Sequence, residues 1–453
     1  MNIAVILAGG SGTRLGDATP KQFLKVAGKK VIEHTIEVFE ANEQIDEICI
    51  VTRAEYLESM EEMTVLNHYK KVKKILRGGA ERYHSSLSAI NAYTNDDDNL
   101  IFHDAVRPLL NDRIINDCIT ALETYQAVDV AIKTTDTIIE VNERECISSI
   151  PNRNVLRNGQ TPQCFKRGLI KMAYDKALAD PHMQTTDDCG VVRKYMPHTD
   201  VFVVNGEVFN MKLTYMEDLF LLDKLFQLRT ITDIKQLSEQ ATKNIKDKVI
   251  VVFGGSYGIG EEVMKIGETL GARMFSFSRS QNGVDVADYK TVQQSLQSVF
   301  DACGKIDSVV CSAGILRKEP LYSMNHETII ESINVNYLGA VNVAKSSFEY
   351  LKHTKGSLLL FTSSSYTRGR MMYSIYSSTK AATVNLVQAL AEEWMYDGVR
   401  INCINPERTK TPMRTSNFGV EPEGTLLDAE SVAIASVNTI FSDFTGEVID
   451  VKR

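Results

Sequence analysis

The chain has 453 residues, a length that exceeds one ordinary hydrophobic core, so we expect about two domains. Hydrophobic residues make up 43% of the chain and charged residues 24%, which is typical of a soluble globular protein. The formal net charge of -8 argues against a general nucleic-acid binder, because contacts with many phosphates require a basic surface. Any anion-binding site in this chain must therefore be a local one.

The eight cysteines include no C-x-x-C pair and no cluster with histidine at the spacing of zinc ligands, so we expect reduced thiols. The N-terminus lacks the pattern of a secretory signal, and no apolar run approaches the roughly 18 residues that a membrane span requires. These observations predict a cytoplasmic protein whose partners include neither a nucleic acid nor a membrane.

Short apolar strands alternate with amphipathic helical patterns twice along the chain, which predicts an α/β fold with a mostly parallel sheet in each half. The expected strands are 3–7, 47–52, 100–103 and 128–133 in the first half and 249–253, 273–277, 308–311, 357–361 and 399–404 in the second. The polar, lysine-rich segment 230–246 is predicted to be a linker, with room for a short helix. This places the two domains at 1–229 and 247–453.

Three glycines, Gly254, Gly258 and Gly260, follow the strand expected at 249–253. A glycine-rich turn between a strand and a helix lets the backbone approach a pyrophosphate, and the helix N-terminus presents free N–H groups to it. The turn therefore predicts a dinucleotide site, although such a turn by itself is often only a tight connection.

Tyr376 and Lys380 have the spacing Tyr-x-x-x-Lys, which places both on one face of a helix, one turn apart. A lysine ammonium in this position is expected to lower the pKa of the phenol, so that it exchanges protons near neutral pH. Ser363 follows the strand expected at 357–361, where its hydroxyl is able to hold a carbonyl oxygen. The tyrosine and lysine by themselves are more often part of a solvated helix face than of an active site.

Further motifs in the second half are CSAG at 311–314, Asn336, NP at 405–406 and TPM at 411–413. Taken together in this order, the motifs of the region from Lys248 to the C-terminus resemble the short-chain dehydrogenase/reductase family. The resemblance implies a doubly wound Rossmann fold and four catalytic residues: Tyr376 as the acid, Ser363 as the group that polarises the carbonyl, Lys380 as the group that orients the nicotinamide ribose, and Asn336 in a proton relay. Ser364 remains the alternative for the role of Ser363, because three serines stand in a row.

The same resemblance implies a set of residues that bind NADP. They are Gly254, Ser256, Tyr257, Gly258, Ile259, Arg279, Asp285, Val286, Ser312, Ala313, Gly314, Tyr376 and Lys380. NADPH is favoured over NADH, because Arg279 follows the second strand at a point where no acidic residue is available for a ribose 2'-hydroxyl. The chain departs from the family pattern in three places: Phe253 replaces a threonine, Cys311-Ser312 replaces paired asparagines, and Glu407 replaces a glycine.

A second glycine-rich loop, LAGGSGTRLG at 7–16, follows the strand expected at 3–7. Arg14 lies among its glycines and Lys21 follows closely. A guanidinium and an ammonium beside free backbone N–H groups suit a triphosphate better than a dinucleotide, although the loop lacks the Gly-Lys-Ser/Thr ending of a Walker motif. A charged surface turn is the alternative for the loop taken alone.

Other polar motifs of the first half are RGGAER at 77–82 with Ser85, HDAVRP at 103–108, NRN at 152–154, TPQ at 161–163, TTD at 185–187, and Lys212 with Thr214. Together with the loop at 7–16 they closely resemble the cytidylyltransferases that act on methylerythritol phosphate and on ribitol 5-phosphate. The resemblance extends from Asn2 to about Leu222 and is nearer to the ribitol branch. It implies a Rossmann-like nucleotidyltransferase fold of the glycosyltransferase-A type.

This resemblance assigns roles by position. CTP would be bound by Leu7, Ala8, Gly9, Gly10, Gly12, Gly79, Arg82 and Ser85, with Arg14 and Lys21 as catalytic residues. The polyol phosphate would be bound by Arg153, Thr186, Lys212 and Thr214, and Mg²⁺ by Asp104. Ala80 replaces an acidic residue of the methylerythritol enzymes, so one contact with the base differs. The implied chemistry is attack of the polyol phosphate on the α-phosphorus of CTP, with release of pyrophosphate.

The order of the two halves resembles enzymes that carry a ribulose 5-phosphate reductase and a CDP-ribitol pyrophosphorylase on one chain, for capsule or teichoic-acid-like polymers. Reduction of ribulose 5-phosphate would yield the ribitol 5-phosphate that CTP then activates, so NADPH, CTP and Mg²⁺ are implied. The ketose phosphate would be bound by one of Arg368, Arg370, Arg408 and Lys410. The resemblance also implies a homodimer or a higher homo-oligomer.

Three alternatives stay open at this point. The same groups would act on another pentitol phosphate, such as xylitol or arabinitol phosphate. A methylerythritol phosphate cytidylyltransferase fused to an unrelated reductase is the second alternative, although the loop at 7–16 is nearer to the ribitol branch. The second half would alternatively be a non-catalytic NADP-binding sensor or an oligomerisation module.

Overall fold

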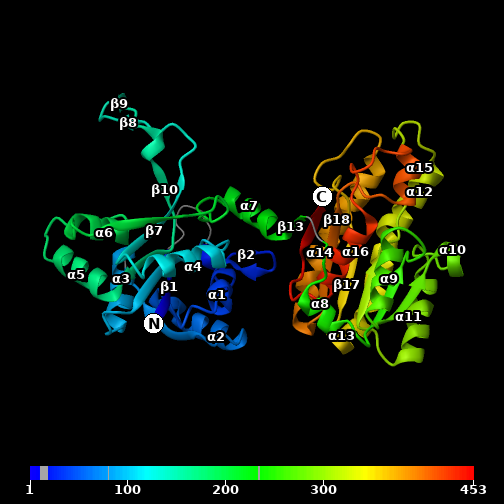
Figure 1. Ribbon diagram of the computed structural model, residues 1–453, viewed down its shortest axis with the longest axis horizontal. Helices are drawn as coiled ribbons and strands as arrows, with labels where there is room; N and C mark the ends of the chain where they lie inside the picture. Colours follow the sequence, from blue (N-terminus) through cyan, green and yellow to red (C-terminus); the bar gives the residue numbers. More distant parts are fainter. Residues whose placement is uncertain (11–18, 80, 233–234) are drawn as a thin grey trace. The chain divides into compact units, whose positions relative to one another are not determined.

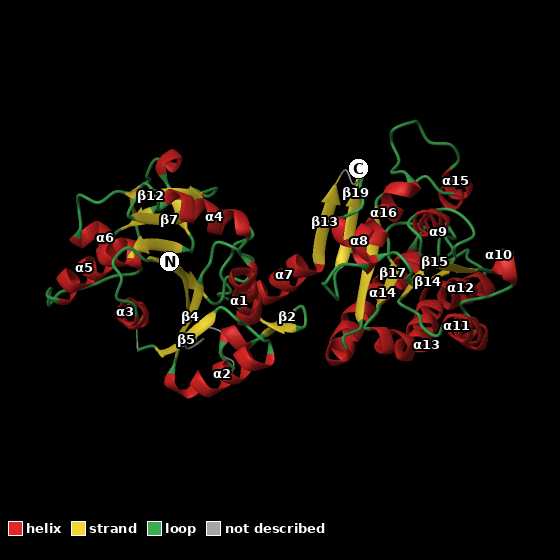
Figure 2. Cartoon of the chain, turned by 60° about the horizontal axis from the view of Figure 1, so that its bottom comes forward, coloured by secondary structure: helices red, strands yellow, loops and turns green. Residues whose placement is uncertain are grey.

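A computed structural model describes residues 1–10, 19–79, 81–232 and 235–453. The chain forms two compact units, Met1–Asp223 and Lys224–Arg453. Each unit has its own sheet of mainly parallel strands, with helices on both sides of the strands (Figure 2). The predicted α/β class with two domains is therefore confirmed. Among the residues that the structure describes, no helix is both long enough and apolar enough to cross a membrane.

The sheet of the first unit has the strand order β10-β7-β11-β6-β1-β4-β5, with β12 beside β7. These strands are β1 (Asn2–Ala8), β4 (Glu47–Thr52), β5 (Val72–Arg77), β6 (Asn99–Asp104), β7 (Ala127–Lys133), β10 (Arg157–Gly159), β11 (Gln163–Lys166) and β12 (Val201–Asn205). Strand β1 pairs in parallel with β4 and β6, and its Leu7 lies opposite Asp104. The glycine-rich loop that follows β1 and the carboxylate of Asp104 therefore leave the sheet at the same edge.

Helices cover both faces of this sheet, which explains why β1 is buried from Ile3 to Ala8. The helices of this unit include η2 (Lys21–Phe23), α1 (Val31–Ala41), η3 (Ala54–Tyr56), α2 (Leu57–Leu66), α3 (Arg82–Ala92), α4 (Asp112–Ala121), α5 (Arg167–Leu178) and α6 (Asp188–Tyr195), and α7 (Met216–Gln227) runs past Asp223, the last residue of the unit. Helix α1 shows the reason for their packing: Ile32, Ile36 and Phe39 recur at helical spacing and all are fully buried.

Three small elements extend from the first unit as an arm (Figure 1). They are β8 (Glu140–Val141), β9 (Ile147–Ser149) and η4 (Arg153–Val155), and β10 connects them to the sheet. A separate hairpin joins β2 (Lys25–Val26) to β3 (Lys29–Lys30). The arm exposes several apolar side chains, including Ile147, Ile150 and Val155.

The sheet of the second unit is parallel throughout, with the strand order β13-β19-β18-β17-β16-β14-β15. The strands are β13 (Leu228–Thr232), β14 (Val249–Phe253), β15 (Arg273–Phe277), β16 (Ser308–Cys311), β17 (Ser357–Phe361), β18 (Arg400–Pro406) and β19 (Val448–Lys452). The expected strands of this half are therefore confirmed, and burial on both faces explains the apolar runs of β14, β16 and β17.

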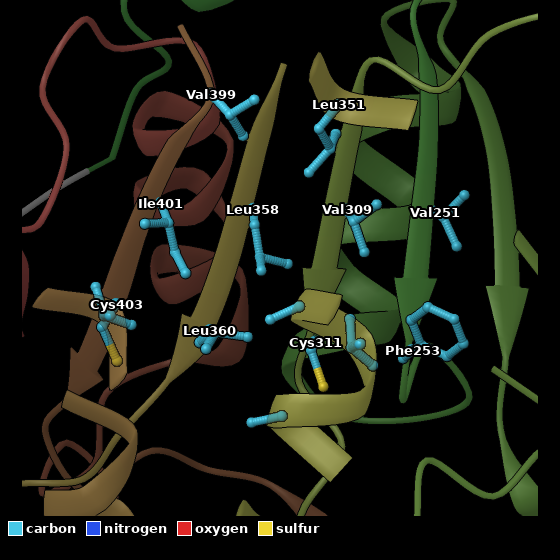
Figure 3. Close-up of a cluster of buried hydrophobic side chains, with 14 of the residues drawn as sticks. Val251, Phe253, Val309, Cys311, Leu351, Leu358, Leu360, Val399, Ile401 and Cys403 are labelled. Atoms are coloured by element: carbon cyan, nitrogen blue, oxygen red, sulfur yellow. The ribbon is translucent and has the colours of Figure 1, made fainter. Parts of the chain in front are cut away.

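Two rows of buried side chains cross the strands of this sheet in register (Figure 3). The first row is Val251, Val309, Leu358 and Ile401, and the second is Phe253, Cys311, Leu360 and Cys403. The alternate residues of the same strands, such as Ile250 and Leu359, belong to a different core on the opposite face. The sheet is therefore packed on both faces by a hydrophobic core, and these cores fix the positions of the carboxyl ends of the strands.

The helices of the second unit are α8 (Glu239–Asn244), α9 (Ile259–Thr269), α10 (Arg279–Asn282), α11 (Tyr289–Cys303), α12 (His326–Ile333), η5 (Asn334–Leu338), α13 (Gly339–Thr354), α14 (Ser374–Trp394), η6 (Met395–Asp397), α15 (Pro412–Phe418) and α16 (Ala429–Ile440). Helix α14 carries both Tyr376 and Lys380, as their spacing predicted. Element η5 is one turn of π-helix that contains Asn336.

Part of the predicted linker 230–246 has regular structure. Strand β13 pairs with β19, and α8 lies within the segment. Ala241 and Ile245 are fully buried against the core of the second unit, because these two apolar residues recur one helical turn apart in an otherwise polar stretch. The domain limits 1–229 and 247–453 remain a prediction.

Ile245→Ala is expected to lower the free energy of unfolding of the second unit by about 2 to 4 kcal/mol, the usual cost of emptying a buried isoleucine site. The chain has a single tryptophan, and Trp394 is buried in the second unit, so its fluorescence during urea unfolding reports on that unit. Lys243→Ala, on the exposed side of α8, is the control and is expected to change this free energy by less than about 0.5 kcal/mol. Equal effects of the two substitutions would contradict the packing of α8.

Candidate active sites

A cavity of about 680 Å³ lies at the carboxyl edge of the first sheet. Its lining includes most of the residues predicted for CTP and polyol phosphate: Leu7, Ala8, Gly9, Gly10, Lys21, Gly79, Arg82, Ser85, Asp104, Lys212 and Thr214. Gly12 and Arg14 lie outside the described residues, as does Ala80. Arg153 lies on the arm and Thr186 just before α6, and neither lines the cavity.

Close packing around the first turn of α3 requires the glycines of this site. A Cβ atom on Gly78 would come within 2.5 Å of Ser85 Oγ, and one on Gly79 would collide with His84. Gly9, in the loop after β1, lies against the same serine hydroxyl: a Cβ atom on Gly9 would come within 3.1 Å of Ser85 Oγ. The loops after β1 and β5 therefore both approach the N-terminus of α3, where free N–H groups and the helix dipole favour an anion.

Lys21 lies in η2, and side-chain hydrogen bonds tie η2 to two other walls of the cavity. Gln22 Nε2 donates to the carbonyl of Ala8 at 2.9 Å, and Lys21 Nζ donates to the carbonyl of Thr214. These contacts bring the predicted catalytic lysine together with the loop after β1 and with the segment of Lys212 and Thr214.

Asp104 is surrounded by cations. Lys212 Nζ lies 3.0 Å and Arg107 Nε 3.5 Å from Asp104 Oδ2. Burial alone would raise the pKa of Asp104, but the charges of Lys212, Arg82 and Arg107 outweigh it and hold the pKa well below its ordinary value. Asp104 is therefore an anion at neutral pH. Across the described residues, no group of three acidic, histidine or cysteine side chains converges on one possible metal position.

A buried histidine fixes the backbone of Asp104. Burial lowers the pKa of His103 to about 4, so its ring is neutral at pH 7. Its Nε2 lies 3.0 Å from the carbonyl of Arg107, which only accepts, so Nε2 carries the proton and Nδ1 accepts from Thr161 Oγ1 at 2.9 Å. The threonine oxygen in turn accepts from the backbone N–H of Asp104 at 3.2 Å. Two separate sequence motifs are joined here because β11 pairs with β6.

Arg82 is held by residues that the sequence analysis did not single out. Its Nη1 donates to Asp188 Oδ2 at 2.5 Å, and the hydroxyl of Tyr174 donates to the other oxygen of this fully buried carboxylate at 2.6 Å. Burial opposes the charge of Arg82, but Asp188 and Asp104 raise its pKa above the ordinary value. Arg82 is therefore a fixed cation in the wall of the cavity. Asp188 directly follows the TTD motif at 185–187, which was the available signal.

A second cavity, of about 550 Å³, lies at the carboxyl edge of the second sheet. Every residue predicted to bind NADP lines it: Gly254, Ser256, Tyr257, Gly258, Ile259, Arg279, Asp285, Val286, Ser312, Ala313, Gly314, Tyr376 and Lys380. Ser363 lines it as well. Asn336 is not a lining residue, but its Oδ1 accepts from Ile315 N at 2.8 Å and its Nδ2 donates to Ile315 O at 2.9 Å.

The glycine turn of this cavity fits a dinucleotide. Gly254 has a φ of 88°, and a Cβ atom there would come within 2.6 Å of Ala313 N. Helix α9 begins at Ile259, directly after Gly258, so its free N–H groups open into the cavity edge. The departure at Ser312 is compensated locally, because its hydroxyl donates to the carbonyl of Gly254 at 3.1 Å and so supports the turn.

The pKa of Tyr376 differs from the expectation. Burial raises it to about 12, while a hydrogen bond with Ser363 opposes the rise. Lys380 Nζ donates to the carbonyl of Phe361 at 2.9 Å and lies 5.8 Å from the centre of the tyrosine ring. The predicted lowering of the Tyr376 pKa by Lys380 is therefore not found, because burial dominates. At neutral pH Tyr376 is a protonated hydroxyl and a hydrogen-bond partner of Ser363.

The structure distinguishes between the two candidate serines. Ser363 is the serine whose hydrogen bond lowers the pKa of Tyr376 against the effect of burial, and its Oγ also accepts from Ser365 Oγ at 3.4 Å. Ser364 Oγ instead accepts from Arg370 Nη2 at 3.0 Å. This geometry favours Ser363 for contact with a reacting carbonyl, and it gives Ser364 a role in holding an arginine.

Arginines line the remaining wall. Of the four basic residues considered for a ketose phosphate, Arg370 and Arg408 line the cavity, whereas Arg368 and Lys410 do not. Arg414 also lines it and was not predicted. Arg279 Nη1 lies 3.4 Å from Glu331 Oε1 and 3.9 Å from Asp285 Oδ2 at the opposite, cofactor-loop side.

Comparison with known proteins gives a family match for each half of the chain. Residues 2–227 match the family model of 2-C-methyl-D-erythritol 4-phosphate cytidylyltransferase, and residues 282–420 match that of short chain dehydrogenase. The chain is 49% identical to the bifunctional ribulose 5-phosphate reductase/CDP-ribitol pyrophosphorylase of Haemophilus influenzae, over 99% of this chain and 95% of the relative. The chain belongs to this bifunctional family.

The first half also has relatives of its own. It is 42% identical to the 2-C-methyl-D-erythritol 4-phosphate cytidylyltransferase of Thermobifida fusca, over 49% of this chain and 92% of that protein. The crystal structure of 4-diphosphocytidyl-2C-methyl-D-erythritol synthase from Anaerococcus prevotii is 30% identical, covers 50% of this chain and 98% of its own, and superposes with a TM-score of 0.45. The predicted pairing of a cytidylyltransferase domain with a short-chain dehydrogenase domain is confirmed.

Ser363→Ala is expected to lower kcat of carbonyl reduction by about 100-fold, because it removes one hydrogen-bond donor to the oxygen on which charge develops. Ser364→Ala is the matched control and is expected to lower kcat by less than about threefold, because its hydroxyl is turned to Arg370. Steady-state rates at saturating coenzyme and ketose give both values. A larger kcat effect at Ser364 would contradict the assignment.

Proposed function

We propose that the chain makes CDP-ribitol in two steps. The second unit reduces D-ribulose 5-phosphate to D-ribitol 5-phosphate with NADPH, and the first unit transfers a cytidylyl group from CTP to this product and releases pyrophosphate. The relation to the bifunctional family over nearly the whole chain carries this proposal. Two separate cavities support it, since each has the groups that one of the steps requires.

For the reduction, bound NADPH would supply a hydride to the carbonyl carbon. Ser363 donates a hydrogen bond to the carbonyl oxygen, and the protonated hydroxyl of Tyr376 delivers the proton that this oxygen takes up. A pKa of about 12 suits this direction of transfer, because the phenol remains protonated at neutral pH. Lys380, buried and fixed on the carbonyl of Phe361, orients the nicotinamide ribose beside Tyr376. Asn336 holds the chain at Ile315 and supports the proton relay.

For the transfer, a phosphate oxygen of ribitol 5-phosphate attacks the α-phosphorus of CTP, and the bond to the β-phosphate breaks. Both reactants are anions, so the cations of the cavity must offset their repulsion. Lys21 and Lys212 lie in its wall, and Arg14 is proposed to join them. Gly9, Gly10, Gly79 and Ser85 provide the close backbone approach that CTP needs.

A bound Mg²⁺ would neutralise phosphate charge and orient the triphosphate. Asp104 fits this ion, because it is an anion at the end of β6 and because Mg²⁺ commonly uses one or two carboxylates, with phosphates and water as its other ligands. Lys212, 3.0 Å from Asp104, is placed to move from this carboxylate to an incoming phosphate.

NADPH is proposed as the coenzyme on the basis of Arg279, which lines the cavity beside the loop after β15 and has Ser278 next to it. A guanidinium there would pair with a 2'-phosphate. Asp285 and Glu331 are the acidic neighbours of Arg279. Their carboxylate oxygens lie 3.9 Å and 3.4 Å from Arg279 Nη1.

We also propose an oligomeric state and a cellular location for the enzyme. The exposed apolar side chains of the arm support a homodimer or higher homo-oligomer. A second copy would also bring an Arg153 to the polyol phosphate, since Arg153 does not line the cavity of its own unit. We place the enzyme in the cytoplasm, where CTP and NADPH are available, with CDP-ribitol serving capsule or teichoic-acid-like polymers.

The full reaction tests this function. The purified chain is incubated with D-ribulose 5-phosphate, NADPH, CTP and Mg²⁺, and we expect equal amounts of NADPH consumed and CDP-ribitol formed. NADH is expected to be the poorer coenzyme, and Arg279→Gln to reduce the preference for NADPH by about tenfold or more, because a charged hydrogen bond is lost. Formation of CDP-ribitol from added ribitol 5-phosphate, without any NADPH consumption from the ketose, would refute the reductase half.

A further inference from the structure

The proposed reduction uses Ser363, Tyr376 and Lys380 but leaves three arginines of the same cavity without a role. Arg370 lies in the loop between β17 and α14, Arg408 in the loop after β18, and Arg414 in α15. All three line the cavity, although they come from different segments of the chain. Glu407 lines the same cavity and Glu421 pairs with Arg414, so two carboxylates accompany these three guanidinium groups and leave a net positive charge for an anionic ligand.

Aromatic rings connect the catalytic tyrosine to one of these arginines. The ring centre of Tyr373 lies 6.2 Å from that of Tyr376 and 6.4 Å from that of Phe418. Arg414 Cζ lies 3.7 Å from the centre of the Phe418 ring. Arg414 and Tyr376 therefore lie at the two ends of a series of ring contacts in the cavity lining.

Glu421 fixes the orientation of Arg414. Its carboxylate accepts from Arg414 Nε at 2.7 Å and from Nη2 at 2.9 Å. Together with the stack on Phe418 these bonds hold the guanidinium plane, and Nη1 has no hydrogen-bond partner among the described residues. Glu421 thus acts as a positioning residue that leaves one edge of Arg414 available.

The charges of Arg370 and Arg408 affect the residues around Arg414. Burial raises the pKa of Tyr373, while the charges of Arg414 and Arg370 oppose the rise. The pKa of Glu421 is lowered first by its hydrogen bond with Arg414 and then by the charges of Arg414 and Arg408. Arg370 Nη2 is steadied by Ser364 Oγ at 3.0 Å. The side chain of Arg408 makes no hydrogen bond or ion pair with any described residue, so its donors remain available.

We propose that Arg370, Arg408 and Arg414 together bind the phosphate of the ketose and so set the preference for a phosphorylated over a free ketose. This inference rests on the proposed reductase function and deepens it. Ser363 and Tyr376 would hold the carbonyl of the sugar, and the three arginines line the same cavity from other segments, where they would meet the phosphate at the other end of the sugar. Guanidinium groups suit this ligand, because their planar donors match phosphate oxygens in pairs.

The test compares D-ribulose 5-phosphate with D-ribulose as substrates for the full chain and for Arg370→Gln, Arg408→Gln and Arg414→Gln. Each variant is expected to lose about 10- to 100-fold in kcat/KM for the phosphorylated ketose, because a charged hydrogen bond is removed. Its kcat/KM for D-ribulose is expected to change by less than about threefold. Arg273→Gln, an exposed arginine outside the cavity, is the matched control and should leave both values unchanged.

A binding measurement keeps the test independent of turnover. Titration of inorganic phosphate into the complex of the full chain with NADP⁺ is expected to give weaker binding in each of the three variants than in the unchanged protein. Equal binding of NADPH by all proteins shows that the cavity remains folded, and Glu421→Gln, which keeps the size of the side chain, is a second probe of Arg414. It should weaken phosphate binding less than Arg414→Gln.

The outcomes separate the inference from the function on which it rests. If the unchanged chain reduces ribulose 5-phosphate and the three variants do so equally well, or if Arg368→Gln causes the same loss, the inference is overturned and the function stands. If the unchanged chain reduces no ketose, the reductase function fails. The phosphate titration then still tests whether the three arginines bind phosphate. Unaltered phosphate binding in the three variants refutes the arginine site, and weakened binding supports it.

Discussion

Both active sites depend on the parallel pairing of strands, because this pairing brings the carboxyl ends of neighbouring strands to one edge of a sheet. In the first unit, Leu7 lies opposite Asp104, so the loop after β1 and the proposed metal-binding carboxylate meet at that edge. In the second unit, Phe253 lies opposite Cys311, and the loops after both residues line the cofactor cavity. Helices on both faces require the central strands, such as β1 and β14, to be apolar, which leaves the edge as the place for polar chemistry.

The two edges differ in the charges that they present, and this difference matches their reactions. The first cavity combines Lys21, Lys212 and Arg82 with one buried acid, Asp104, which suits two polyanionic reactants and a divalent cation. The second has an uncharged turn at Gly254, with Arg279 on the cofactor side and further arginines on the substrate side. In the proposed function, one sugar phosphate would meet cations twice: as a ketose phosphate before reduction and as a polyol phosphate before cytidylyl transfer.

The sequence was sufficient for features that depend on local pattern. The strands expected in the second half, the glycine turn after β14 and the position of Tyr376 and Lys380 on one helix were predicted from neighbouring residues, and the structure places them as expected. Contacts between distant segments were not predictable in this way: Arg82 and Asp188 are 106 positions apart. The pKa of Tyr376 was misjudged because it depends on burial, which the helix spacing does not reveal. A short helix was allowed for in the segment 230–246, but the packing of α8 against the core was not predicted, because only Ala241 and Ile245 carry it in a lysine-rich stretch.

The central claim is that each unit completes one of two successive reactions. Its most direct test is a mixture of two variants, Tyr376→Phe and Asp104→Asn, supplied with D-ribulose 5-phosphate, NADPH, CTP and Mg²⁺. Each variant alone should form almost no CDP-ribitol, because the first lacks the proton donor for reduction and the second lacks the carboxylate for cytidylyl transfer. The account predicts that the mixture forms CDP-ribitol after a lag in which ribitol 5-phosphate accumulates. A mixture as inactive as its components would contradict it.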